Sequence, residues 1–224
     1  MEEYLSERQQ MDWLRATVKE NAPWALGGVA ITLALFVGYH QWQNWGERQA
    51  ATASQKYEAT LDALARGDGD NAKRLVAELR DGYARTPYAD QAALALARYD
   101  VEGRRLADAA ALLEAVIKNT RDPELATVAR LRLARVQRAD GKPGLALATL
   151  AAAPAGTVSA AFADVRGDVL LDQGDKAGAL AAWREALAAK SPGVNRELLE
   201  LKIGALEGPA EPAAAPSPAT GAKP

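Results

Sequence analysis

Three aspartates at regular spacing are the residues of this sequence whose pattern could most readily support chemistry. Asp164, Asp168 and Asp172 recur every four residues, so they share one face of a helix. Carboxylates in such a row can face solvent, contact a partner or hold a metal ion. We interpret the row as a solvated face first, a partner-contact stripe second and a metal site last. Arginines on the preceding segment are candidates to pair with these acids: Arg130, Arg135 and Arg138.

No arrangement of residues in this sequence predicts catalysis or a cofactor. Cysteine is absent, which excludes a thiol nucleophile, disulfides and Cys-ligated zinc. The only histidine, His40, follows an apolar run without a partner motif, so we interpret it as an interfacial residue. The sequence also lacks a glycine-rich phosphate loop and His/Glu metal spacing. We therefore expect a protein that is not an enzyme, has no cofactor and, at a net charge of −2, does not bind nucleic acid.

A charge-free run from Ala22 to Tyr39 divides the chain into a short and a long part. A helix needs about 17–25 residues to span the hydrocarbon core of a bilayer, and aromatic residues favour the two interfaces. Trp24 lies near the start of the run, and Trp42 and Trp45 follow its end. We predict a single transmembrane anchor over 22–41. A cleaved signal peptide and a buried helix of a soluble protein are the alternatives.

The segment before the anchor, 1–21, reads as a short leader helix, with a break between Asn21 and Pro23 because proline suits the first turn of a new helix. Basic residues near the anchor slightly favour a cytoplasmic N-terminus. They are Arg8, Arg15 and Lys19 before it, and Arg48 and Lys56 after it. In a bacterium the long C-terminal part would then be periplasmic, with the anchor in the inner membrane.

One face of the predicted anchor carries only small residues, at spacings of three, four and four: Gly27, Ala30, Ala34 and Gly38. Small residues let membrane helices approach closely, whereas large apolar ones face lipid. The opposite side holds Leu26, Leu33, Phe36 and Val37. We predict that the small face packs against another membrane helix.

Beyond the anchor, residues 42–207 repeat a helix-pair pattern. The marker alanines 72, 109, 146 and 179 are 37, 37 and 33 residues apart, near the 34-residue period of tetratricopeptide repeats. An unrelated alanine-rich bundle is the alternative. The expected pairs are 48–66 with 69–84, 87–101 with 105–118, 122–139 with 143–152, and 158–173 with 176–189. The predicted fold is all-α, a tetratricopeptide-like solenoid after the anchor.

The last repeat carries the clearest pattern. Gly167 falls where the first helix needs a small residue, and Trp183 should lie between Ala179 and Ala186. Residues 193–207 suit a capping helix, on which Trp183 should pack. Residues 208–224 hold five prolines and no large apolar side chain, and should form a disordered tail.

Arg98, Arg135 and Asp168 fall at the same position of successive repeats. First helices of such repeats line a groove in which partner segments dock. We predict that these three residues face that groove and bind a partner protein.

The leader before the anchor carries a distinctive motif, Gln9-Gln10-Met11-Asp12-Trp13-Leu14 followed by Val18-Lys19-Glu20-Asn21. With the anchor, the aromatic exit and the repeats, the layout resembles the YfgM-like family of ancillary SecYEG translocon subunits. The resemblance implies a non-enzymatic inner-membrane protein, in contact with lipid and beside the SecYEG translocon. It also implies a membrane-anchored, parvulin-like periplasmic chaperone as partner, to which exported proteins are passed. The tail departs from the family pattern.

An anchored scaffold for cytochrome c maturation or for pilus or envelope assembly is the alternative function. A haem-handling version should carry a partner motif with histidine or cysteine, and the sequence has none. An enzyme is the third class of function, but the sequence contains no catalytic constellation.

Overall fold

The computed structural model describes residues 7–154, 160–189 and 194–208, and every regular element within these ranges is a helix. The chain separates into two compact units, Met1–Gln55 and Lys56–Pro224. Residues 1–6 and most of the proline-rich tail, 209–224, lie outside the described ranges.

The first helix, α1 (Glu7–Ala65), begins in the first unit and runs without interruption through residues 21–23. The predicted break between Asn21 and Pro23 is therefore wrong. Proline removes one backbone donor, but its fixed φ is itself helical, so a helix can continue through it when its neighbours support the helix.

Large apolar side chains of α1 in the first unit are exposed around the helix rather than along one stripe. Ile31, Leu33, Leu35, Phe36 and Val37 are all more than half exposed. The Thr32 hydroxyl donates to the carbonyl oxygen of Gly28 at 2.8 Å, so it is satisfied within the helix. Within the described residues, we find no helix whose length and apolar character suffice for crossing a membrane.

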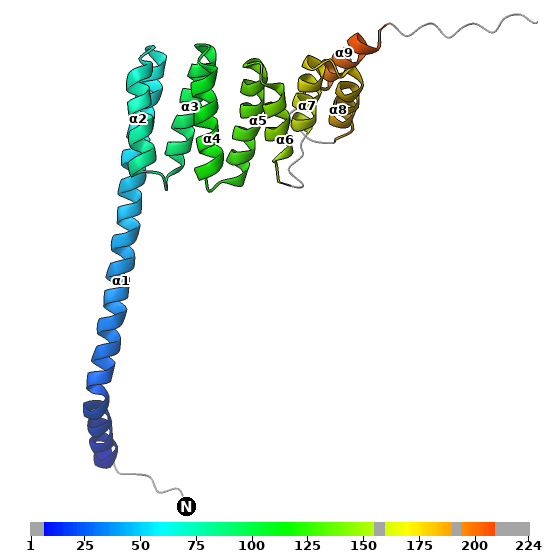
Figure 1. Cartoon of the computed structure of the whole chain (residues 1–224). Helices are drawn as coiled ribbons and strands as arrows, with labels where there is room; N and C mark the ends of the chain where they lie inside the picture. Colours follow the sequence, from blue (N-terminus) through cyan, green and yellow to red (C-terminus); the bar gives the residue numbers. More distant parts are fainter. Residues whose placement is uncertain (1–6, 155–159, 190–193, 209–224) are drawn as a thin grey trace, which may run out of the picture. The chain divides into compact units, whose positions relative to one another are not determined.

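The second unit is a row of antiparallel helices in which consecutive members lie side by side from α2 onwards (Figure 1). The predicted pairs and the final helix are confirmed to within about three residues, since short helices fray at their ends, except for the predicted start at residue 48, which is wrong because α1 already begins at Glu7. The helices after α1 in the described ranges are α2 (Gly69–Gly82), α3 (Pro87–Glu102), α4 (Leu106–Asn119), α5 (Pro123–Ala139), α6 (Pro143–Ala151), α7 (Ala160–Asp172), α8 (Lys176–Ala188) and α9 (Arg196–Glu207).

The turn inside each pair contains one residue in the left-handed region. Gly67, Gly141 and Gly174 have φ values of 76°, 71° and 83°, but in the second pair the residue is Arg104, at 60°. The neighbouring Gly103, which the sequence pattern marks as the turn glycine, has a φ of −81° and caps α3. The turn geometry thus repeats more strictly than the glycine does.

The marker alanines of the four pairs lie in the buried interior of the solenoid. Ala72, Ala109, Ala146 and Ala179 are completely buried. Small residues there let the backbones approach, and larger side chains fill the space toward the next pair. The predicted repeat register is therefore confirmed.

Candidate partner-binding groove

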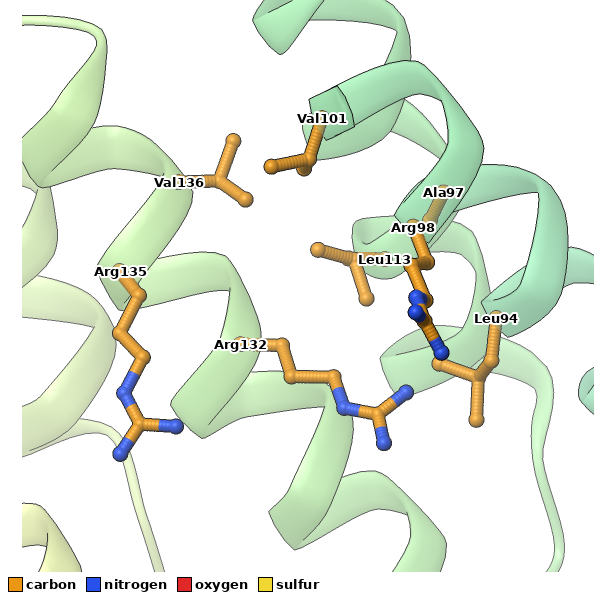
Figure 2. Close-up of a pocket in the computed structure, with 8 residues that line it drawn as sticks. All are labelled: Leu94, Ala97, Arg98, Val101, Leu113, Arg132, Arg135 and Val136. Atoms are coloured by element: carbon orange, nitrogen blue, oxygen red, sulfur yellow. The ribbon is translucent and has the colours of Figure 1, made fainter. Parts of the chain in front are cut away.

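A hollow of about 330 Å³ opens between α3 and α5 (Figure 2). Its apolar walls come from Leu94, Ala97 and Val101 on α3, Leu113 on α4 and Val136 on α5. Helical spacing explains the arrangement, because residues 94, 97 and 101 lie on one face of α3. The side chains that complete the lining are three arginines: Arg98, Arg132 and Arg135.

A second, larger hollow of about 610 Å³ adjoins the first and shares Leu94, Arg98 and Arg132 with it. It extends across α3 to Tyr57 and Leu64 near the end of α1. Both hollows are lined mainly by first helices of successive pairs. We call the two together the arginine groove.

The arginines of this groove are weakly engaged by the rest of the chain. The Arg98 Nε lies 2.8 Å from the Glu102 Oε1, in a pair whose side chains are 81% and 60% exposed. Such an exposed pair one helical turn apart contributes about 0.3–0.5 kcal/mol. Within the described residues, Arg132 and Arg135 form no ion pair. The groove therefore presents positive charge beside an apolar surface.

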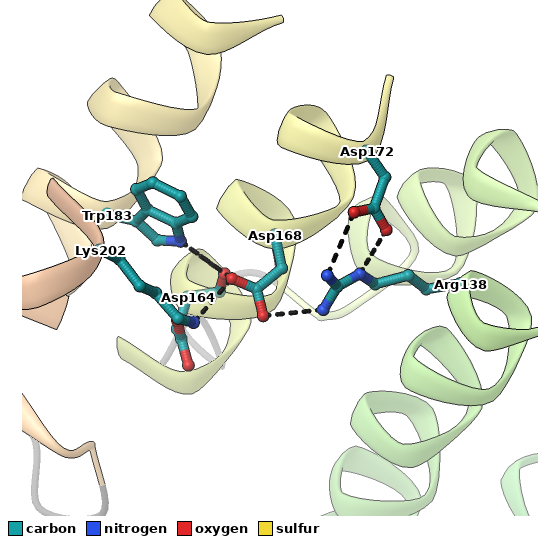
Figure 3. A network of polar contacts seen from close by, with 6 residues as sticks. All are labelled: Arg138, Asp164, Asp168, Asp172, Trp183 and Lys202. Carbon is teal, nitrogen blue, oxygen red and sulfur yellow. Dashed lines mark hydrogen bonds and ion pairs between the residues drawn. The ribbon is translucent and has the colours of Figure 1, made fainter. Parts of the chain in front are cut away.

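The structure brings together two of the three predicted partner-binding residues. Arg98 and Arg135 both line the groove, whereas Asp168 belongs to a polar network at the end of the solenoid (Figure 3). Asp168 accepts hydrogen bonds from the Arg138 Nη1 at 2.9 Å and from the Lys202 Nζ at 2.6 Å. It also accepts one from the Trp183 Nε1 at 3.2 Å.

The rest of the aspartate row belongs to the same network. Asp164 accepts from the Lys202 Nζ at 2.7 Å, and Asp172 pairs with Arg138 at 2.5 Å. A solvated face is the wrong interpretation for Asp164 and Asp168, whose side chains are only 19% and 18% exposed. The predicted pairing with arginine is confirmed for Arg138.

Arg138 also sets the electrostatics of the exposed end of this row. Its hydrogen bond to Asp172, followed by their charge attraction, lowers the pKa of that carboxyl below its usual value. The same hydrogen bond raises the pKa of Arg138. In the described part of the chain, no cluster of residues could hold a metal ion.

The predicted packing of Trp183 is confirmed. This side chain is 1% exposed and packs with Ala179, Ala186 and Leu199 of α9. A Cβ added at Gly167 would lie 2.4 Å from two atoms of the indole ring, so this position requires glycine. The Lys202 Nζ lies 5.5 Å from the centroid of the same ring.

Sequence reasoning missed Arg132 in the groove and Lys202 in the network. Arg132 precedes Arg135 by three residues and so shares its helix face, which was a usable signal. Lys202 lies 34 residues beyond Asp168, and no local spacing connects the two.

The small residues predicted as a helix-packing face lie on α1, in the first unit. Gly27, Ala30, Ala34 and Gly38 are all exposed. A Cβ at either glycine would meet no atom within 4 Å outside its own turn of helix. The packing of this face against another helix stays a prediction.

The fold and the groove place this protein in the class of tetratricopeptide-like solenoids. A solved structure titled as Podosopora anserina putative kinesin light chain nearly identical TPR-like repeats is similar in fold, with a TM-score of 0.54. The similarity covers 70% of this chain and 85% of that one at 17% sequence identity, so it concerns the fold alone.

Relatives narrow the class further. Residues 15–208 match the tetratricopeptide repeat-like domain family. The ancillary SecYEG translocon subunit of Escherichia coli K12 is 31% identical over 92% of this chain and 99% of its own length. Its namesake in Neisseria gonorrhoeae is 26% identical over 92% of this chain and 100% of its own length. The chain therefore belongs to the tetratricopeptide repeat-like family of ancillary SecYEG translocon subunits.

Proposed function

We propose that this protein is a non-enzymatic ancillary subunit of the Sec translocon, whose solenoid binds partner proteins in the arginine groove. The observation that carries the proposal is the combination of full-length relatives bearing this name with a positively charged groove between repeats. Tetratricopeptide-like solenoids present extended surfaces for such contacts.

The proposed partner in the groove is a periplasmic chaperone of the parvulin-like, membrane-anchored kind, so that exported proteins pass from the translocon to folding factors. Support comes from the resemblance of the leader and the anchor to this family and from the exposed arginines Arg98 and Arg135.

A pull-down of the intact protein in mild detergent, followed by mass spectrometry, tests this proposal. Translocon subunits and an isomerase-like chaperone should be recovered. The double variant Arg98→Glu, Arg135→Glu should lose the chaperone and keep the translocon subunits. The matched control Arg80→Glu, Arg121→Glu changes charge in a different hollow and should lose neither. Recovery of cytochrome maturation or pilus assembly factors instead would contradict the assignment.

The proposed location is the bacterial inner membrane, with 22–41 as the anchor, 1–21 in the cytoplasm and 42–207 in the periplasm. Lipid contact would cover the apolar side chains of α1 that are exposed on every side, including Ile31 and Leu35. Protease added to spheroplasts should digest the chain beyond about residue 50 and spare the leader. Protection of the solenoid would overturn this topology.

The small face of α1 is the proposed contact with a membrane helix of the translocon or chaperone. Photo-crosslinkers at Ala30 and Ala34 should capture a membrane protein, whereas probes at Leu33 and Phe36 should capture mainly lipid. Equal capture from both faces would show that the stripe carries no recognition.

A further inference from the structure

We infer that the arginine groove selects a short acidic segment of its partner, in which carboxylates flank one bulky apolar side chain. The inference rests on the proposed function, because it names the class of ligand that the same groove takes. It is carried by the charge and the shape of the groove together.

The charge of the groove differs from that of the rest of the chain. Its lining holds three arginines against one acid, Glu102, while the whole chain has a net charge of −2. Several arginines elsewhere in the solenoid are matched by acids of the chain itself. Examples are Arg74 with Glu78, Arg105 with Asp100, Arg138 with Asp168 and Asp172, Arg166 with Glu185, and Arg184 with Glu207.

Because Arg132 and Arg135 have no acidic partner within the described residues, carboxylates of a ligand can pair with them without displacing an acid of the chain. Guanidinium groups hold carboxylates through paired hydrogen bonds, with a geometry that a single ammonium lacks. Electrostatic complementarity of this kind also speeds association and excludes basic segments.

The shape of the groove adds the apolar part of the ligand. The three arginines line a hollow whose apolar walls include Leu94, Leu113 and Val136 (Figure 2). A leucine- or phenylalanine-sized side chain would bury these walls, and a purely charged ligand such as a polyanion would leave them facing water. The adjoining hollow toward Tyr57 gives the segment room to continue across α3.

Selection of a random peptide library on the full-length protein in detergent micelles tests the inference. Selected peptides should be enriched in Asp and Glu on either side of a bulky apolar residue, and their affinity should fall as sodium chloride is raised. Selection of peptides without acidic enrichment would overturn the inference while leaving the groove as a binding site. Failure to select any peptide would instead contradict the groove itself as the binding surface.

Variants of the groove sharpen the same experiment. The triple variant Arg98→Gln, Arg132→Gln, Arg135→Gln should bind the best acidic peptide about ten-fold more weakly, since each exposed pair is worth little and three together add up. The matched triple variant Arg80→Gln, Arg85→Gln, Arg121→Gln loses the same charge from another hollow and should bind normally. Equal weakening by both triples would mean that only net charge matters and would overturn the inference.

Discussion

The arginine groove and the polar network at the end of the solenoid occupy equivalent places in successive repeats, yet they are built in opposite ways. Arg98 and Arg135 stand exposed beside an open hollow. Asp168, at the same repeat position, is largely buried between Arg138 and Lys202. The difference arises because a further helix, α9, packs against the last pair.

This contrast shows that the same repeat position can be exposed in an inner repeat and covered by a capping helix in the terminal one. A terminal repeat has no next repeat to cover it, so its outer face needs a capping helix. The cap brings one cation, Lys202, to two acids, Asp164 and Asp168, and covers Trp183. The equivalent residues of the inner repeats, Arg98 and Arg135, stay exposed.

We expect the largest effect from a substitution in the end of the solenoid that α9 covers. Truncating a buried tryptophan typically costs about 3–5 kcal/mol, so Trp183→Ala should lower the melting temperature of the full chain strongly. Hydrogen exchange should show α7 to α9 opening first, because their shared core is lost. An unchanged melting temperature would mean that Trp183 does not hold this end together.

Overpacking the same contact should cost somewhat less. Gly167→Ala places a methyl group against the indole of Trp183 and should destabilise the fold by about 1–3 kcal/mol, measured by chemical denaturation. Gly204→Ala is the control, because a Cβ there meets nothing and alanine favours a helix by about 0.5–1 kcal/mol. The two variants should therefore shift stability in opposite directions.

Removing Lys202, the α9 cation of the network, tests how far the packing of α9 on the last pair depends on charge. Lys202→Met should cost about 1–3 kcal/mol, because it leaves two partly buried carboxylates without their shared ammonium. Lys73→Met removes a more exposed pair with Asp108 and should cost much less, because solvent screens an exposed pair. Similar losses in the two variants would show that the network is an ordinary surface feature.

The pH dependence of the network follows from Asp172. Because Arg138 lowers the pKa of this carboxyl, the pair stabilises the fold above the unfolded pKa near 3.8. This contribution is lost as the pH falls through the lower folded pKa. Melting curves of native protein and Arg138→Gln should differ most above about pH 5 and converge toward about pH 2. A constant difference would contradict this linkage.

We expect the smallest effect on stability from substitutions in the arginine groove. Arg98→Gln and Arg135→Gln should change the free energy of unfolding by less than about 0.5 kcal/mol, because exposed side chains away from special features rarely matter more. A circular dichroism melt of the double variant checks this. A large loss would place these arginines in the framework of the fold and out of the proposed ligand site.

The sequence by itself determined the helices and their register. Close packing of two helices demands a small residue at a fixed place in each pair, so the spacing of Ala72, Ala109, Ala146 and Ala179 is readable without coordinates. The same logic marked Gly167 as a position that needs a small residue, and the structure shows that the ring it accommodates is the indole of Trp183. Arg98 and Arg135 were found by counting the repeat.

Only the tertiary structure decided which charges are open and which are satisfied. Arg135 and Arg138 are one helical turn apart, yet one lines a hollow and the other pairs with Asp168 and Asp172. The left-handed turn residue Arg104, beside an available glycine, was equally beyond local reasoning. Pairing depends on distance in space, and the lysine that completes the partly buried network comes from α9, which packs against the last repeat.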